Sequence, residues 1–343
     1  NATEKAEKEQ GQRLNEYEDE INKYLGNSKD ESKDDTKGTT VEEAIKKNGA
    51  LSTTDNTELK DAKNNKIVVP AGFKIVEGAT TVDKGIVIED VTETATKGSQ
   101  FVWIPVGTII KSDGTTATIT LGRYDFDATT GKESAYSGSY IEEDANDTST
   151  LKKYGNIIAK NIRNFKNSVA TNGGYYIGRY EARTVTARNA AGNALTQITE
   201  KGTENVYNYV TQLQAAQLSQ NMYNNDNFTS DLMNSYAWDT ATVFIQNCGT
   251  NAKYSRQISL NTSLLQTGTN SLTDTSKIDV QCNIYDMASN IEEWTTETSY
   301  DSDSPCVYRG GFYGNSDHYT SCRDGNSTSD SNVIVGFRPL LYL

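Results

Sequence analysis

Few side chains of this 343-residue chain could do chemistry. There is one histidine, His318, and there are four cysteines, Cys248, Cys282, Cys306 and Cys322. A single histidine excludes a histidine-rich zinc site and a relay between two histidines. Successive cysteines are 34, 24 and 16 residues apart, a spacing that fits no CxxC metal or redox motif. The residue types therefore point away from most histidine-based chemistry and from CxxC-type sites.

The even number of cysteines would suit two disulfides in an exported protein, although four cysteines allow three connectivities. We expect a disulfide between Cys306 and Cys322, which would close the base of a hairpin around the loop between them. The alternative is four free, buried thiols.

The composition narrows the classes of partner. Hydrophobic residues make up 35% of the chain and charged residues 23%, which supports a folded core. The net charge of −13 argues against nucleic acid as a partner, because such a binder needs a basic face. Proteins and glycans stay open as ligands. No run of 18 apolar residues and no signal peptide occurs, and the first residue is Asn1, so we expect that an N-terminal piece was removed.

One segment near the C-terminus looks like neither core nor linker. Twelve of the twenty residues from Tyr313 to Asn332 are Tyr, Ser, Gly or Asn. Antibody paratopes favour this mixture, because Tyr gives contact area at low entropic cost and the small polar residues give adaptable hydrogen bonds. The segment therefore reads as a binding surface.

The same region lacks five amino acid types. Lys, Gln, Met, Trp and Glu supply 63 of the first 297 residues and none of the last 46, where the same frequency would give about ten. These are the five amino acids whose codons never end in a pyrimidine, so a tail written in codons of the form NNY would exclude them. The alternative is that surface β-loops simply prefer Ser, Asn, Asp and Gly.

The elements that must position this segment fall into three parts. Residues 1–25 are rich in Glu, Lys and Ala and predict a helical stalk that ends at Gly26. Residues 26–65 are polar and predict a flexible linker, with one short helix at Val41–Lys47. Residues 66–343 predict one domain, in which 313–332 forms the variable C-terminal region.

Within that domain the periodicity favours strands around two helices. Apolar runs between Gly and Pro predict strands at 67–70, 73–76, 85–88, 101–106 and 175–180 and a hairpin over 111–121 that turns at Asp113-Gly114. Residues 125–147 look like an irregular insertion loop. Helical spacing predicts helices over 206–223 and 232–246. The expected fold class is α+β.

Six strings in order carry a resemblance to a known family. They are FVWIPVG (101–107), YYIGRYEA (175–182), SYAWDTATVF (235–244), NIYDMASNIEEWT (283–295), YRGG (308–311) and GFR (336–338). This order resembles the sulfatase-modifying, formylglycine-generating enzyme family, which implies a C-type lectin-like fold over 66–343. The family's oxidases carry a reactive cysteine pair a few residues after RGG, where this chain has Phe312 to Thr320. The resemblance therefore implies the fold without the enzyme.

Several glycine, arginine and tryptophan residues in or near these strings have predicted structural roles. Gly310 and Gly311 allow a close approach of the backbone. We expect Arg309, Arg323 and Arg338 to brace loops against carboxylates such as Asp286 and Glu293. Trp103, Trp238 and Trp294 suit a core with few but specific polar contacts.

A second group on the same fold fits the tail better. The chain resembles the variable proteins of diversity-generating retroelements, in which adenine-directed mutagenesis rewrites AAC-type codons near the C-terminus. The resemblance implies that the ligand-binding, variable positions are Tyr313, Asn315, Ser316, Asp317, His318, Tyr319, Asp324, Asn326, Ser329, Asp330 and Asn332. An ordinary exposed loop histidine is the other reading of His318.

The N-terminal 24 residues look like the stretch that follows the apolar helix of pilin-like surface proteins of Gram-positive bacteria. The expected function is a non-catalytic, adhesin-like receptor on the bacterial cell surface or on a filament, attached through a missing anchor helix. Its ligand would be a protein or a glycan. The alternatives are a structural minor subunit of a pilus-like filament and an oxidase that has replaced the cysteine pair. No cofactor is expected; the many Asp residues leave room for a structural calcium ion, but no ordered ligand pattern is present.

Overall fold

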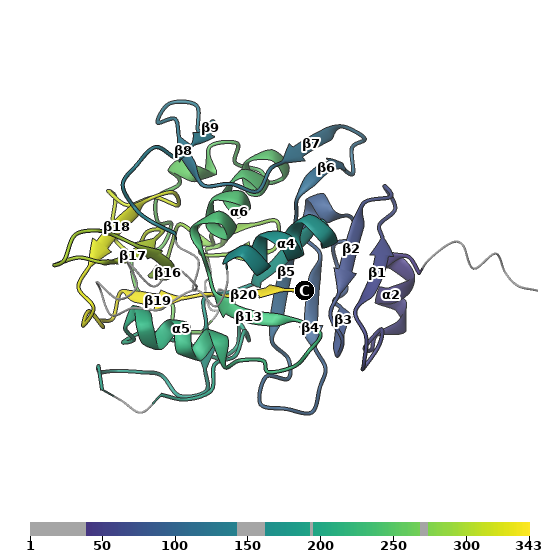
Figure 1. The fold of residues 1–343 in the computed structure, drawn as a ribbon, viewed down its shortest axis with the longest axis horizontal. Coiled ribbons are helices and arrows are strands. Elements are labelled where there is room, and N and C mark those ends of the chain that lie inside the picture. Colours follow the sequence, from purple (N-terminus) through teal and green to yellow (C-terminus); the bar gives the residue numbers. More distant parts are fainter. Residues whose placement is uncertain (1–38, 143–161, 193–194, 268–273) are drawn as a thin grey trace, which may run out of the picture. The chain divides into compact units, whose positions relative to one another are not determined.

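A computed structural model describes residues 39–142, 162–192, 195–267 and 274–343 (Figure 1). Thr39–Leu343 forms one compact unit. The stalk predicted at 1–25 and the first part of the linker, 26–38, lie outside the described residues.

A six-stranded antiparallel sheet runs through the centre of this unit. In spatial order its strands are β13 (Thr229–Leu232), β20 (Pro339–Tyr342), β10 (Gly174–Gly178), β5 (Gln100–Pro105), β4 (Val87–Asp90) and β3 (Phe73–Ile75). Strand β10 lies between β5 and the C-terminal β20, with Tyr176 opposite both Trp103 and Leu341. All five residues of β10 are buried, as expected for the centre of a sheet that is covered on both faces.

A four-stranded sheet carries the C-terminal region. Its order is β18 (Arg323–Asn326), β17 (Cys306–Arg309), β16 (Glu292–Thr298) and β19 (Val335–Phe337). Strand β19 runs parallel to β16, whereas the other pairs are antiparallel. The view in Figure 1 places this sheet at the opposite end from α2 and β1.

Five two-stranded ribbons complete the strands. They are β1 (Thr57–Lys60) with β2 (Lys66–Val69), β6 (Gly107–Ile110) with β7 (Thr116–Ile119), β8 (Tyr124–Phe126) with β9 (Glu133–Ala135), β11 (Arg183–Thr184) with β12 (Asn205–Val206), and β14 (Val280–Gln281) with β15 (Ile284–Tyr285). The hairpin predicted to turn at Asp113-Gly114 is confirmed, because Gly114 N–H donates to the Lys111 carbonyl between β6 and β7.

The α-helices of the described residues are α2 (Val41–Lys47), α4 (Ile162–Asn172), α5 (Gln212–Gln220) and α6 (Ser235–Cys248), with short 3-10 turns at Val82–Lys84, Tyr254–Arg256 and Thr275–Lys277. Local sequence explains where α5 begins: Thr211 and Gln214 form a capping box, which satisfies two otherwise unpaired backbone N–H groups. Asn234 caps α6 in a similar way by accepting from Ala237 N–H.

The three tryptophans lie in the core, each fully buried. Trp238 Nε1 donates to the Thr320 carbonyl at 2.9 Å and Trp294 Nε1 to the Val210 carbonyl at 2.8 Å. The indole N–H of Trp103 has no hydrogen-bond partner among the residues that the structure describes. The prediction of a core with few but specific polar contacts therefore holds for Trp238 and Trp294.

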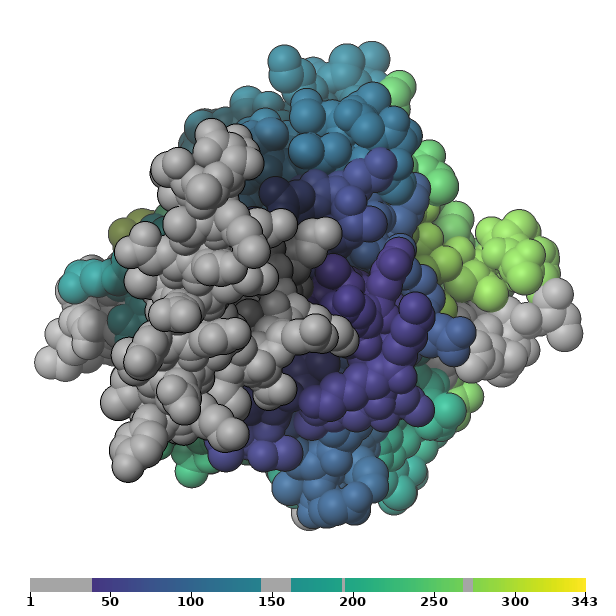
Figure 2. Space-filling view, turned by 90° about the vertical axis from the view of Figure 1, so that its right-hand side faces the viewer, coloured from purple at the N-terminus to yellow at the C-terminus, as the bar shows by residue number. Residues whose placement is uncertain are grey.

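The linker predicted over 26–65 is wrong from Thr39 onward. Helix α2 has the bounds predicted for it, and β1 pairs in register with β2, so the domain begins well before residue 66. The polar composition hid three apolar anchors, Val41, Ala44 and Leu59, which are almost completely buried. In Figure 2 the purple atoms of this segment cover the middle of one face, below the blue atoms of the β6–β7 hairpin.

The two long predicted helices are shorter than expected. In 206–223 only Gln212–Gln220 is helical, because Asn205–Val206 pairs with β11 instead. In 232–246 the first residue belongs to β13, and the helix begins at Ser235. The predicted α+β class is confirmed as a mixed fold of mainly antiparallel sheets. None of the helices described is both long enough and apolar enough to cross a membrane.

Candidate functional site

The predicted variable region divides into two loops joined by an edge strand. The first loop leaves β17 at Gly310 and returns at Cys322; β18 then forms the edge of the four-stranded sheet; the second loop, 327–334, leads into β19. We call the six-stranded sheet, the four-stranded sheet and α6 the frame of the domain. Two of its strands, β17 and β19, therefore hold the ends of the segment, and both are fully buried.

Most residues of this segment are at least partly exposed, although the Arg323 side chain is only 7% exposed and pairs with buried carboxylates. Among the twenty residues Tyr313–Asn332 only Thr320 is buried. Of the eleven candidate positions, Ser316, Asp317, Asp324 and Ser329 are exposed, and seven are partly exposed: Tyr313, Asn315, His318, Tyr319, Asn326, Asp330 and Asn332. None of the eleven candidate residues is therefore buried.

Two clusters form within the region. In the first loop the Asn315 side chain accepts hydrogen bonds from the N–H groups of Asp317 and His318, at 2.6 and 2.9 Å. In the second, Asp330 accepts from the side-chain amides of Asn326 and Asn332, each at 3.0 Å. Asn315, Asn332 and Asp330 thus shape the loops, because short polar side chains can replace backbone partners in turns.

His318 is neither freely exposed nor unpartnered. Its Nδ1 forms a short hydrogen bond with Oε1 of Glu292, a residue of β16 that is 1% exposed. Burial raises the pKa of Glu292 to about 7, although the hydrogen bond and charge of His318 oppose the rise. Asp324, another of the eleven candidates, also contacts the frame through its side chain, because its carboxylate accepts from the Tyr308 hydroxyl of β17 at 3.3 Å.

Ion pairs hold the frame beneath the loops. Arg309 donates to Asp239 of α6 at 2.6 Å, and Arg323 forms ion pairs with both Asp239 and Glu297 of β16. The side chains of Arg309, Asp239 and Glu297 are fully buried and that of Arg323 is 7% exposed, and charge-assisted bonds of this kind fix geometry. The arginines therefore tie β17 and β18 to α6 and β16.

The predicted bracing role of the arginines is confirmed, with a partial change of partners. Arg338 pairs with Glu293 through two bonds, at 2.6 and 3.1 Å, as predicted. Arg309 and Arg323 pair with Asp239, a carboxylate that the prediction did not name, and no arginine ion pair of the described residues involves Asp286. Asp286 is buried beside Asp279, and burial raises its pKa to about 7.

The glycines after Arg309 are required by contact distances. Gly310 has φ +83°, and a Cβ there would lie 2.7 Å from the Met287 carbonyl oxygen. A Cβ on Gly311 would lie equally close to the Ala288 carbonyl oxygen. The first loop therefore starts by packing its backbone directly on the DMASN segment.

A cavity of about 290 Å³ opens beside the first loop. Its walls are Tyr319, Ser321, Cys322 and Arg323 from the C-terminal region and Tyr124, Asp125, Phe126, Tyr136, Tyr140 and Arg256 from elsewhere. The Arg256 guanidinium lies 3.7 Å from the ring centre of Tyr319. The Arg323 guanidinium lies 4.1 Å from the ring centre of Tyr136. Cation–π contacts at these distances order the aromatic walls.

Sequence reasoning missed the contribution of the β8–β9 ribbon to this cavity. The polar composition of 125–147 predicts an irregular insertion loop instead of a ribbon. A signal was present: Tyr124, Phe126, Tyr136 and Tyr140 place four aromatics within seventeen residues. Such a density is typical of binding surfaces more than of solvated loops.

The predicted disulfide between Cys306 and Cys322 is wrong. Cys306 lies opposite Asn326 and Arg309 opposite Arg323, so Cys322 lies past the other end of the ladder. At about 3.3 Å per residue the two cysteines are about 13 Å apart, beyond the ~7 Å that a disulfide can bridge. The backbone hydrogen bonds between β17 and β18 hold this hairpin together, and no disulfide does so.

No group of three or more His, Cys, Asp or Glu side chains in the described part of the chain has the arrangement of a metal site. The buried carboxylates around Asp239 and Glu297 face arginines, which excludes a cation there.

Comparisons with solved structures find similar chains, among them the following two. Treponema denticola variable protein 1 is 12% identical with a TM-score of 0.36, over 73% of this chain and 98% of that one. CarF is 19% identical with a TM-score of 0.24, over 33% of this chain and 48% of that one. No family model matches the chain, and no curated protein matches it. Scores this low assign neither family nor function.

Proposed function

We propose that this protein is a non-catalytic binding protein with a C-type lectin-like fold, whose ligand is a protein or a glycan gripped by the surface of Tyr313–Asn332. One observation carries the proposal: nineteen of these twenty residues are at least partly exposed, whereas the strands that hold them, β17 and β19, are fully buried. At its exposed positions such a surface can change side chains without changing the core, whereas Arg323 and His318 contact buried carboxylates.

The chemistry of the surface suits recognition. Tyr313 and Tyr319 offer aromatic anchors, and Asp317, Asp324 and Asp330 offer hydrogen-bond acceptors. The aromatic wall of β8 and β9 adds contact area beside Tyr319 that would stay constant when the loops vary. The net charge of −13 favours ligands other than nucleic acid.

The properties of Cys322, the cysteine near the site, argue against the alternative of an oxidase with a reactive thiol. Burial raises the pKa of Cys322, so this thiol is protonated at neutral pH and is a poor nucleophile. Phe312 to Thr320, where the oxidases place their cysteine pair, holds no cysteine. An assay of peptide-cysteine oxidation with copper is expected to give no turnover.

We further propose that the surface is diversified by a retroelement. The absence of Lys, Gln, Met, Trp and Glu after residue 297 supports this, because a preference for exposed loops alone does not explain the loss of Lys and Glu. The neighbouring DNA should then contain a near-identical repeat of the tail that differs only at adenines, beside a reverse transcriptase gene. A locus without such a repeat would leave the binding proposal standing and remove this one.

Two matched libraries test the binding proposal. One varies the exposed candidates Ser316, Asp317, Asp324 and Ser329; the control varies four exposed threonines of the β6–β7 hairpin region, Thr108, Thr116, Thr118 and Thr120. After display and selection on a pure protein that the native chain does not bind, the first library is expected to give specific binders and the control none. Melting temperatures in both should stay within about 2 °C of native, since exposed substitutions change stability by about 0.5 kcal/mol or less. Widespread unfolding in the first library, or equal success of the control, would contradict the proposal.

Display at a bacterial surface is part of the same proposal. It rests on the helical composition of residues 1–25, which lie outside the described structure. Labelling of intact cells with an impermeant amine reagent should modify the protein, and electron microscopy of the full-length chain separates a surface receptor from a filament subunit.

A further inference from the structure

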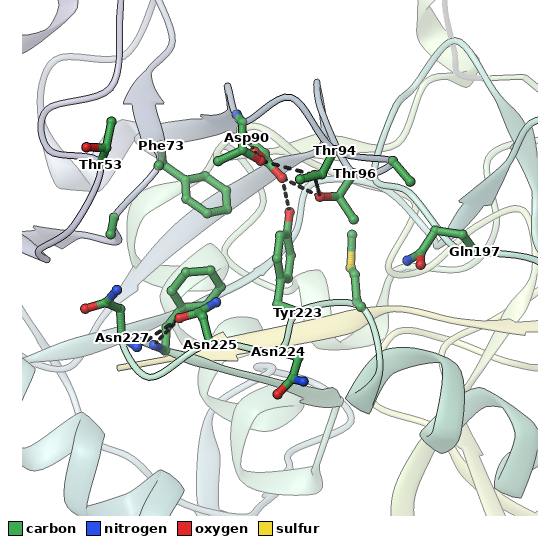
Figure 3. A pocket seen from close by; sticks show the side chains of 16 residues that line it. Thr53, Phe73, Asp90, Thr94, Thr96, Gln197, Tyr223, Asn224, Asn225 and Asn227 are labelled. Carbon is green, nitrogen blue, oxygen red and sulfur yellow. Dashed lines mark hydrogen bonds between the residues drawn. The ribbon is translucent and has the colours of Figure 1, made fainter.

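A second cavity lies in a different part of the domain from the C-terminal loops. It measures about 340 Å³, which is within the usual range for small-molecule sites. Four connections meet there: the loop before β1, the turn between β2 and β3, the β4–β5 connection and the loop after α5, joined by Gln197 (Figure 3). Its walls contain no residue of 313–332.

Aromatic rings form the floor of this cavity. Phe73 packs edge-on against Phe228 with ring centres 5.6 Å apart, and Tyr223 lies 5.2 Å from Phe228 and 5.9 Å from Phe73. The Phe73 and Phe228 side chains are almost fully buried. Edge-to-face packing of this kind makes a rigid apolar surface.

The one carboxylate of the cavity is already saturated. Asp90 is 1% exposed and accepts four hydrogen bonds: from Thr92 N–H at 2.8 Å, from the Thr92 and Thr96 hydroxyls at 2.5 Å each, and from the Tyr223 hydroxyl at 2.9 Å. Figure 3 shows these bonds converging on Asp90 above the ring of Tyr223. A carboxylate held in this way has little left to offer a cation.

The rim of the cavity is polar and uncharged. The lining residues contain no Lys, Arg or His, which makes an anionic ligand unfavourable. What the rim presents are hydroxyl and amide side chains from Thr53, Thr94, Gln197, Asn224, Asn225 and Asn227. Each amide can donate and accept, so the rim matches a ligand that also does both.

The walls are fixed before any ligand arrives. Asn56 joins two of the connections, because its amide donates to the Asn227 carbonyl at 2.7 Å and its oxygen accepts from Ala71 N–H at 3.1 Å. Asn225 holds the turn after α5 by accepting from the N–H groups of Asn227 and Phe228. A site that needs no rearrangement avoids part of the entropic cost of binding.

We propose that this cavity binds an uncharged sugar residue of a glycan. A sugar ring has an apolar C–H face, which can contact the part of the aromatic floor that borders the cavity, and hydroxyls that both donate and accept, which the amide and hydroxyl rim can satisfy. The site is separate from the surface of Tyr313–Asn332 and does not depend on its function.

The test uses the full-length chain and the methyl glycosides of glucose, mannose, galactose, N-acetylglucosamine and N-acetylgalactosamine. Saturation-transfer NMR is expected to detect at least one of them, with the strongest transfer to ring C–H protons. The double variant Gln197→Ala/Asn224→Ala should raise the Kd about tenfold, because two hydrogen bonds to the ligand are lost. The matched control Gln217→Ala/Asn221→Ala, which removes one exposed glutamine and one exposed asparagine of α5 and its C-cap, should bind like the native protein.

Two further arms separate this site from the alternatives. Tyr313→Ala/Tyr319→Ala should leave glycoside binding unchanged; a loss there would assign the sugar to the C-terminal surface and overturn the proposal. Methyl glucuronide should bind more weakly than methyl glucoside, and equal binding would contradict an uncharged ligand. Absence of transfer to all five glycosides, or native affinity in the first double variant while its melting curve is unchanged, would also overturn it.

Discussion

At the scale of single residues, the candidate positions are not equivalent. Ser316, Asp317, Asp324 and Ser329 are exposed, whereas Asn315, Asp330 and Asn332 also accept the hydrogen bonds that shape their loops. The sequence predicts which residues face outward because Tyr, Ser, Gly and Asn cluster in it. It could not predict which of them support a turn, because that depends on backbone geometry.

His318 provides the test of this distinction. Replacement by Ala removes the hydrogen-bond partner of the buried Glu292 carboxyl, so the pKa of Glu292 should rise further above about 7. We expect His318→Ala to lower the free energy of unfolding by about 1–3 kcal/mol at pH 8, the cost of an unsatisfied buried polar group. Urea denaturation measures this. Asp317→Ala, next to it and exposed, should change stability by about 0.5 kcal/mol or less. Equal effects of the two would mean that His318 is an ordinary loop residue.

At the scale of elements, the buried ion pairs decide how the loops are held. The sequence predicts that Arg309 and Arg323 brace the loops against carboxylates, and both arginines form such ion pairs. Their common partner, Asp239, lies on α6, seventy residues earlier than Arg309. Hydrophobic spacing places Trp238 on the buried face of this helix and says nothing of a buried carboxylate beside it. The partner could not be predicted because it depends on how α6 packs against β16.

Asp239→Ala should therefore destabilise the protein strongly. It leaves Arg309 buried without its 2.6 Å partner and leaves Arg323 with Glu297 alone, and breaking a buried pair costs about 3–5 kcal/mol. Urea denaturation should show this loss. A useful companion is Asp324→Ala on β18, which is exposed and should have little effect. A loss below about 1 kcal/mol for Asp239→Ala would show that the network does not hold the sheet to α6.

At the scale of the whole molecule, the strings that resemble a family mark the frame. Phe101–Gly107 covers β5, 175–182 covers β10, and 308–311 and 336–338 enclose the C-terminal loops. Those parts were predictable because buried strands have apolar, Gly-punctuated sequences. The start of the domain at Thr39 was not, since its anchors are only a few apolar residues in a polar stretch. The contribution of the β8–β9 ribbon to the cavity was not predicted either, because its aromatic residues also lie in a polar stretch.

The frame also carries a property that belongs to the whole fold, a set of buried carboxyl groups with raised pKa. Burial raises the pKa of Glu142, Asp286 and Glu292 to about 7 each. In the unfolded chain these groups ionise near pH 4, so between about pH 4.5 and 7 the folded state binds more protons. Stability is therefore expected to fall as the pH rises through this window and to level off above it. The carboxyls with lowered pKa, such as Asp113 and Asp127, act only below pH 4 and do not oppose the trend.

We expect the free energy of unfolding to be higher at pH 5.5 than at pH 8, by at least about 2 kcal/mol, because a single group moved from pKa 4.5 to about 7 contributes about 3 kcal/mol over the full window. Urea denaturation at a series of pH values, at constant salt, measures the slope. Glu292→Gln keeps a hydrogen-bond acceptor for His318 but cannot ionise, so its curve should be flatter than that of the native protein. The exposed Asp317→Asn serves as its control and should keep the native slope. Native stability that does not fall from pH 5.5 to 8 would show that the pKa values of these carboxyls are not raised in the folded protein.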